Sequence, residues 1–152
     1  MALDEIARTA GVANATLYRH FPTRTELIIA VYSSEVSELD HLAKRLMNAD
    51  DPDRALAEWL RAFVRHVADK RELALALPDE PRGQRGALFA DWHDAMNAAA
   101  GMLLARAQAA DAARREIDAR DLLALATGIA LTGLPGDRTE RLLALARQGY
   151  AN

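Results

Sequence analysis

Apolar residues recur along most of this chain three and four residues apart, and hardly anywhere in strict alternation with polar ones. The first apolar face has the spacing i, i+3, i+4 and i+7, and its members are Leu3, Ile6, Ala7 and Ala10. Gly11 follows at once, in the place where a left-handed residue commonly ends a helix. The pattern predicts an all-α protein whose first helix ends near residue 10.

Two further helices are predicted directly after the first one. A second short helix is expected from about Asn14 to His20, because Pro22 restricts the backbone of the residue before it. Thr23 with Glu26 three residues later forms a capping-box pattern, which predicts a third helix lasting to about Met47.

Further along, Asp51 and Pro52 suit the N-cap and the first position of another helix. The charged run 69–72 and the Pro/Gly-rich segment 78–86 predict turns or a loop after it. A long helix is expected over 87–110, a helix capped by Asp118 through Leu131, and a last helix that starts at Asp137 or Thr139 and ends near residue 150.

The natural boundary lies around residues 47–52. We predict a helix-turn-helix module with its connecting helix over residues 1–47. A larger helical ligand-binding and dimerisation domain is expected over residues 48–152.

Composition narrows the class of protein. With 51% hydrophobic and 27% charged residues the chain belongs to folded proteins, and without cysteine it has neither disulfides nor thiolate metal sites. The longest apolar tract, 122–134, is too short to span a membrane, so a cytoplasmic protein without a membrane partner is expected. The net charge of -3 gives no general attraction to nucleic acid, so any such interaction must be local.

The first two helices, joined by a glycine-containing turn, have the form of a helix-turn-helix. Leu17 and Phe21 lie four residues apart and would anchor the second helix to its module. The other face would then enter the major groove of DNA. Tyr18 and His20 suit phosphate oxygens, Thr16 suits a phosphate or a base edge, and Arg19 suits guanine.

Arg8 and Arg24 would flank the groove as clamps on the DNA backbone. Only Asp4 and Glu5 oppose the arginines of residues 1–24, so binding would depend on placement more than on net charge. Periodicity alone leaves an alternative to DNA binding: the two helices are an ordinary pair of surface helices with a polar exterior.

The run from Leu3 to Ile28 closely resembles the DNA-binding domain of TetR/AcrR-type transcriptional regulators, whose signature is G-V-x-x-x-T-L-Y-x-H-F with a charged turn and a leucine after it. The matching residues here are Gly11, Val12, Thr16, Leu17, Tyr18, His20, Phe21, Arg24, Glu26 and Leu27. The resemblance implies that Gly11 forms the turn and that DNA is faced by Asn14, Ala15, Thr16, Tyr18, Arg19, His20 and Arg24. It further implies a variable helical ligand domain whose last two helices form a dimer.

Two departures from the family pattern stand out. The family has Ser or Thr where Ala13 stands, and the missing cap costs roughly 1 kcal/mol unless Asn14 replaces it. The family's domain also has a further helix before the equivalent of Leu3, so Leu3, Ile6 and Leu17 are expected to lose a packing partner. Either the sequence is truncated or starts at a mis-assigned site, or the module is less stable and DNA binding is impaired.

Aromatic residues cluster in two of the predicted body helices, at Trp59 and Phe63 and at Phe89 and Trp92. They either fill the core or line a cavity with polar anchors, and the family resemblance favours a cavity for an effector. The candidate ligand-binding residues are Trp59, Phe63, His66, Phe89, Trp92, His93 and Met96, with Asp94 as a further polar anchor.

The helix over 119–131 is apolar on more than one side, so it must be covered twice, and the last helix carries one apolar stripe. We predict that these two helices form half of a four-helix dimer interface. The alternative is that the helix over 119–131 lies inside the core of a single chain. The candidate interface residues are Leu122, Leu125, Ala126, Ile129, Leu142, Leu143, Ala146 and Tyr150.

An enzymatic function has little support. Glu38 and His41 have the Glu-x-x-His spacing of di-iron bundles, but the sequence lacks the second copy that such a site needs, and a solvated helix face explains them better. No cofactor or metal is expected. We expect a ligand-responsive transcriptional regulator, a repressor, that binds a near-palindromic operator in double-stranded DNA as a homodimer and is released by a small-molecule effector. The alternative is a helical small-molecule-binding dimer that has lost DNA binding with the first helix.

Overall fold

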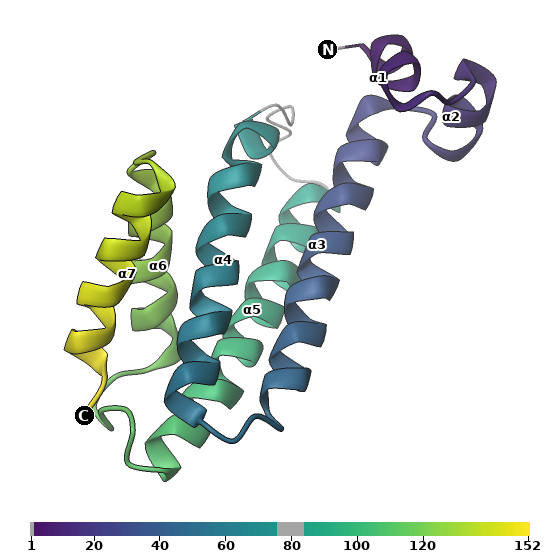
Figure 1. Ribbon diagram of the computed structural model, residues 1–152. Coiled ribbons are helices and arrows are strands. Elements are labelled where there is room, and N and C mark those ends of the chain that lie inside the picture. Colours follow the sequence, from purple (N-terminus) through teal and green to yellow (C-terminus); the bar gives the residue numbers. More distant parts are fainter. Residues whose placement is uncertain (1, 76–83) are drawn as a thin grey trace.

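The computed structural model of the chain describes residues 2–75 and 84–152, and the predicted all-α fold is confirmed. Within these ranges the chain forms seven α-helices (Figure 1). Their bounds are α1 Leu3–Ala10, α2 Asn14–His20, α3 Arg24–Leu46, α4 Pro52–Leu75, α5 Gln84–Ala109, α6 Ala119–Leu131 and α7 Gly136–Tyr150. The strand-like pairing in the described ranges is an isolated bridge between Ala113 and Ala151.

The turn between α1 and α2 has the predicted form. Gly11 ends α1 with φ at 68°, the left-handed region that glycine adopts without strain. Ala13 occupies the N-cap of α2 without a side-chain hydrogen bond, and Asn14 is already the first helical residue. Asn14 therefore does not replace the missing cap.

The predicted capping box at Thr23 and the predicted cap at Asp118 are both present, and each forms a complete capping box. At the start of α3, the Glu26 backbone N–H donates to Thr23 Oγ1 over 3.2 Å, and the Thr23 N–H donates to Glu26 Oε2 over 2.9 Å. At the start of α6, Asp118 and Asp121 exchange the equivalent bonds, each 3.0 Å long. These exchanges satisfy backbone donors that a helix start otherwise leaves unpaired.

Three predicted boundaries are wrong. The helix α4 continues through the charged run 69–72, because Lys, Arg and Glu are good helix formers and the run contains neither Gly nor Pro. Of the predicted loop 78–86, residues 78–83 lie outside the described ranges, whereas 84–86 already belong to α5. The helix α7 begins at Gly136, directly after Pro135, and not at Asp137 or Thr139.

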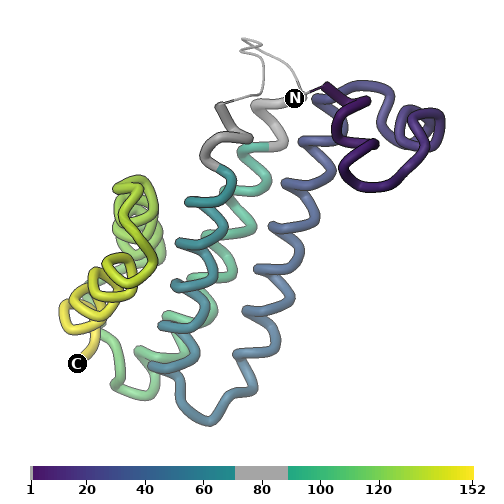
Figure 2. Tube along the Cα trace, turned by 45° about the horizontal axis from the view of Figure 1, so that its top comes forward, coloured from purple at the N-terminus to yellow at the C-terminus, as the bar shows by residue number. Residues whose placement is uncertain are grey.

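The long helices α3, α4 and α5 pack against one another, and α6 covers α4 and α5 (Figure 1). The helix α7 packs on α6 and α4, on the side of α4 away from α3. The pair α1–α2 lies at the N-terminal end of α3, outside the bundle, as the trace in Figure 2 also shows. The main core runs through the bundle from Val36 onward, and Leu3 and Ala7 are buried apart from it.

None of the helices in the described part of the chain is both long enough and apolar enough to cross a lipid bilayer. The division of the chain at residues 47–48 stays a prediction.

Candidate functional site

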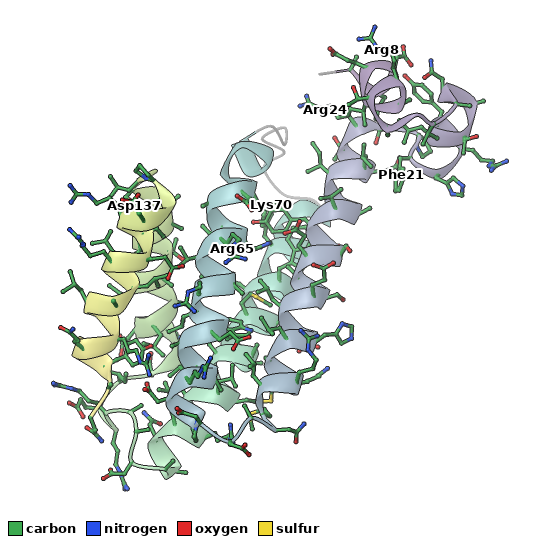
Figure 3. All side chains as sticks on the ribbon, viewed as in Figure 1. Arg8, Phe21, Arg24, Arg65, Lys70 and Asp137 are labelled. Carbon is green, nitrogen blue, oxygen red and sulfur yellow. The ribbon has the colours of Figure 1, made fainter. Side chains whose placement is uncertain are left out.

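The residues predicted to face DNA are all at least partly accessible. Thr16 is half-buried, and the other members of the set are exposed: Arg8, Asn14, Ala15, Tyr18, Arg19, His20 and Arg24. Figure 3 shows Arg8 and Arg24 on the N-terminal module, at the outer end of α3. The accessible side chains therefore sit on one protruding module.

The apolar side of this module is only partly covered. Leu17 and Phe21 are half-buried, and α2 contains no buried residue. The expected loss of packing at Leu3 is not seen, because Leu3 is buried, whereas Ile6 and Leu17 remain half-buried. The helix α2 is thus held mainly by contact with α1.

Two of the predicted DNA-facing residues lie next to acidic side chains of α1. A hydrogen bond to the Asp4 carboxylate raises the pKa of the Tyr18 phenol above its usual value. Arg8 and Asn14 line one surface depression of about 530 Å³ together with Asp4 and Glu5. The surface is therefore mixed in charge and not uniformly basic.

A cavity of about 700 Å³ lies between α3, α4, α5 and α6, and we call it the α3–α6 cavity. Six of the seven predicted ligand-binding residues line it: Phe63, His66, Phe89, Trp92, His93 and Met96. Asp94 lines it as well. The structure thus brings together, from two helices, side chains that lie far apart in the sequence.

Trp59 is the exception, and its assignment to the cavity is wrong. Its side chain is fully buried, and its indole Nε1 donates to the Leu39 carbonyl over 2.9 Å. Trp59 also stacks on Phe63, with ring centroids 5.5 Å apart. It joins α4 to α3 inside the core and does not line the cavity.

Sequence reasoning missed the contribution of α3 to this cavity. Tyr32 stacks on Trp92 at 4.5 Å and meets the edges of the His66 and Phe89 rings. Burial raises the pKa of the Tyr32 phenol above its usual value. The available signal was the helical spacing of Ile28, Tyr32 and Val36, since the last two also line the cavity.

An ion cluster ties α3 to α4 beside these rings. Nδ1 of the buried His66 lies 3.1 Å from Glu35 Oε2, and Lys70 Nζ lies 2.7 Å from Glu35 Oε1. Figure 3 places Lys70 on the α3 side of α4. Burial alone would raise the pKa of Glu35, but the hydrogen bonds and positive charges of Lys70 and His66 outweigh it and hold that pKa low.

The remaining lining residues come from α5 and α6, and sequence reasoning missed most of them: Asn97, Arg120, Leu123, Ala124 and Thr127. Asn97 Nδ2 donates to the His93 carbonyl over 2.9 Å. Within the described ranges, neither the Asp94 carboxylate nor the Arg120 guanidinium has a hydrogen-bond or ion-pair partner.

The predicted dimer-interface residues divide into two groups. Leu122, Ala126, Ile129 and Tyr150 are buried within the chain's own core, so this part of the prediction is corrected. Leu122, Ala126 and Ile129 lie on the side of α6 that packs in the core, and Tyr150 joins the same core from α7. Leu142, Leu143 and Ala146 are half-buried, and Leu125 is 46% exposed.

The apolar surface of α6 and α7 extends beyond the predicted set. Leu131, Leu134 and Leu145 are 49%, 45% and 57% exposed. Sequence reasoning missed these three leucines, although Leu145 shares a helix with Leu142 and Leu143. Leu131 and Leu145 therefore lie on the helices that the prediction named, and Leu134 lies in the connection between them.

A second hollow of about 710 Å³ lies along α4, α6 and α7. Its charged residues are paired: Arg61 Nε donates to Glu140 over 2.8 Å, and Arg147 binds Asp53. Burial raises the pKa of Tyr150, at the same hollow, to about 12. We call this hollow the α4–α7 groove.

In the described parts of the chain, His, Asp and Glu side chains nowhere gather in a group that could hold a metal ion. Glu38 and His41 are exposed on α3, as a solvated helix face requires.

Family models match both parts of the chain. Residues 51–151 match the C-terminal domain of SbtR-like transcriptional regulators, and residues 1–31 match the N-terminal domain of bacterial regulatory proteins of the tetR family. No curated protein matches the sequence of this chain.

Solved structures share the fold over nearly the whole chain. The TetR transcriptional regulator SCO0520 from Streptomyces coelicolor is 36% identical, with a TM-score of 0.83, over 99% of this chain and 87% of its own. A TetR transcription regulatory protein from Mycobacterium vanbaalenii is 29% identical, with a TM-score of 0.71, over 100% of this chain and 84% of its own. The regulator FadR from Bacillus subtilis, solved in complex with stearoyl-CoA, is 15% identical, with a TM-score of 0.67, over 97% and 84% of the two chains.

Proposed function

Because the chain belongs to the TetR family of transcriptional regulators, we propose that it is a ligand-responsive repressor. It binds a near-palindromic operator as a homodimer, through the module that holds α1 and α2, and a small-molecule effector in the α3–α6 cavity releases it. The module over residues 1–47 and the body over 48–152 are the two functional parts. No step of this role needs a cofactor or a catalytic residue.

One observation carries the proposal: the helix that leads into the α1–α2 module also forms a wall of the cavity. Tyr32 and Val36 of α3 line the cavity, and Glu35 of the same helix is tied to α4. A ligand that displaces Tyr32 or His66 therefore acts directly on α3. Since α3 begins four residues after the end of α2, the two sites influence each other through differential binding to two arrangements of this helix.

The DNA contacts follow from the exposed face of α2. Tyr18 and His20 donate to phosphate oxygens, Arg19 reaches a guanine, and Arg8 and Arg24 hold the backbone on either side. A protein with a net charge of -3 needs such local placement to bind a polyanion.

The dimer forms through the apolar surface of α6 and α7, centred on the exposed Leu125, Leu131 and Leu145. Pairing of these helices with their copies makes a four-helix interface with two-fold symmetry. The same symmetry places two α2 helices on successive half-sites of the operator.

An electrophoretic mobility shift with DNA from upstream of the protein's own gene tests the proposal. Wild-type protein is expected to shift this fragment and not an equal length of unrelated coding DNA. Tyr18→Ala removes an exposed phosphate donor and weakens the shift at least tenfold, whereas Glu58→Ala, exposed on α4, leaves it unchanged.

A folded wild-type protein that shifts no such fragment would overturn the DNA-binding part of the proposal. The chain would then be the small-molecule-binding dimer without DNA binding. An unchanged shift by Tyr18→Ala would show that α2 does not face the groove as proposed.

A further inference from the structure

We infer that the ligand of the α3–α6 cavity is an organic acid. Its apolar part is at least as large as one aromatic ring, and its carboxylate pairs with Arg120. The inference rests on the proposed effector role of the cavity and adds the chemical class of the effector.

Arg120 differs from the other arginines that line a hollow in the bundle. In the α4–α7 groove, Arg61 is bound to Glu140 and Arg147 to Asp53, and Arg114 lies 3.8 Å from Glu116. Arg120 lines the α3–α6 cavity without a hydrogen-bond or ion-pair partner among the described residues. Its guanidinium is thus available to a ligand.

Most polar side chains of the cavity come from α5 and α6, and His66 lines it from α4. Arg120 and Thr127 lie seven residues apart on α6, two helical turns on one face, and His93 faces the same cavity from α5. Aromatic side chains from three helices, Tyr32, Phe63, Phe89 and Trp92, also line it. A site with this division suits a molecule with an apolar body and one polar end.

The kind of polar end follows from the hydrogen-bonding groups available. A guanidinium only donates, and its planar fork matches the two oxygens of a carboxylate. Thr127 adds a hydroxyl donor on the same helix face. Asp94 is the opposing group, because its carboxylate also lines the cavity and repels an anion. An acid therefore binds with its carboxylate near Arg120, and removal of the Asp94 charge strengthens that binding.

Isothermal titration calorimetry with a matched pair of probes tests the inference: 4-phenylbutyrate and its neutral analogue 4-phenylbutanol. Wild-type protein is expected to bind the acid roughly tenfold more tightly than the alcohol, as a charge-assisted hydrogen bond allows. Arg120→Gln removes this preference but still binds the alcohol, and Asp94→Asn raises the affinity for the acid severalfold. Arg65→Gln, on the exposed surface of α4 outside the cavity, keeps the wild-type preference.

Equal affinity of wild-type protein for acid and alcohol, or binding of neither at millimolar concentration, would overturn the organic-acid class. A preference that survives Arg120→Gln would overturn the role of Arg120. Both substituted side chains are exposed, so the variants keep the fold, and circular dichroism checks this. The titration contains no DNA, so its failure is distinct from a failure of the mobility shift.

Discussion

Acidic side chains set the electrostatics of both candidate sites. On the DNA-facing module, the Asp4 carboxylate accepts a hydrogen bond from the phenol of Tyr18, a group that is proposed to bind phosphate. Beside the cavity, Glu35 of α3 pairs with both His66 and Lys70 of α4. Asp4 therefore opposes the proposed binding of phosphate, whereas Glu35 stabilises the packing of α3 on α4.

Asp4→Asn is expected to tighten binding to the operator by roughly two- to fivefold at low salt, because a negative charge close to the DNA phosphates is removed. Fluorescence anisotropy with a labelled operator measures this change. Glu58→Gln, which removes an acid from the exposed surface of α4, serves as the control and leaves the affinity unchanged. Weaker binding by Asp4→Asn would instead mean that Asp4 orients Tyr18 toward DNA.

The lowered pKa of Glu35 makes a prediction about stability and pH. A carboxyl group whose pKa is lower in the folded than in the unfolded protein contributes stability above its unfolded value of about 4.5, and this contribution is lost as the pH falls through the folded value. The free energy of unfolding in urea should therefore decline below about pH 4.5, and Glu35→Gln should reduce the part of that decline due to this group. Glu38→Gln, exposed on the same helix, should keep the wild-type pH profile.

At the scale of the helices, α3 holds the two proposed functions together. Its first turn follows the α2 segment directly, and its middle packs on α4 and α5. Trp59 fixes one of these contacts, since its Nε1 hydrogen bond reaches the backbone of α3 at Leu39.

Trp59→Phe is expected to lower the free energy of unfolding by about 1–3 kcal/mol, because the Leu39 carbonyl loses a buried donor and the core loses volume. Trp92→Phe should cost less, because this side chain borders the cavity and donates no hydrogen bond to another described residue. Urea denaturation followed by circular dichroism compares the two. An equal or larger loss for Trp92→Phe would contradict the assignment of Trp59 to the core.

The sequence predicts helix ends well where a side chain marks them locally. The Thr23/Glu26 and Asp118/Asp121 pairs and Gly11 act through contacts a few residues away, so their spacing carries the information. It predicts much less well which side of an apolar helix faces which neighbour. Trp59 and Trp92 are of the same residue type, yet only the packing of α4 on α3 shows that Trp59 lies in the core.

The candidate cavity illustrates the same limit at the level of a site. Phe63, His66 and Trp92 were predictable as aromatic and polar residues of two body helices. Tyr32 and Arg120 belong to helices that were assigned other roles, linking the module and forming the dimer. The spacing of Ile28, Tyr32 and Val36 indicates an inward face of α3, but which cavity that face borders depends on how four helices pack.

For the whole molecule, the exposed leucines of α6 and α7 are the natural place for a second copy to bind. The helices α6 and α7 lie on the side of α4 away from α3, so a dimer formed there leaves the α1–α2 module free (Figure 1).

Leu145→Glu is expected to convert the dimer to a monomer at micromolar concentration, because it places a charge in the apolar interface. Light scattering coupled to size-exclusion chromatography measures the mass. Val31→Glu, a partly exposed apolar position on α3, should remain a dimer. A monomeric wild-type protein, or an unchanged mass for Leu145→Glu, would place the interface elsewhere or exclude it.

The central claim is that the exposed face of α2 meets DNA. Hydrogen–deuterium exchange of the full chain, with and without operator DNA, tests this claim most directly, because it reports backbone protection along the sequence without any substitution. The account predicts slower exchange over residues 3–24 when DNA is present, with the largest change in α2. Protection confined to α6 and α7, with residues 14–20 unchanged, would contradict it.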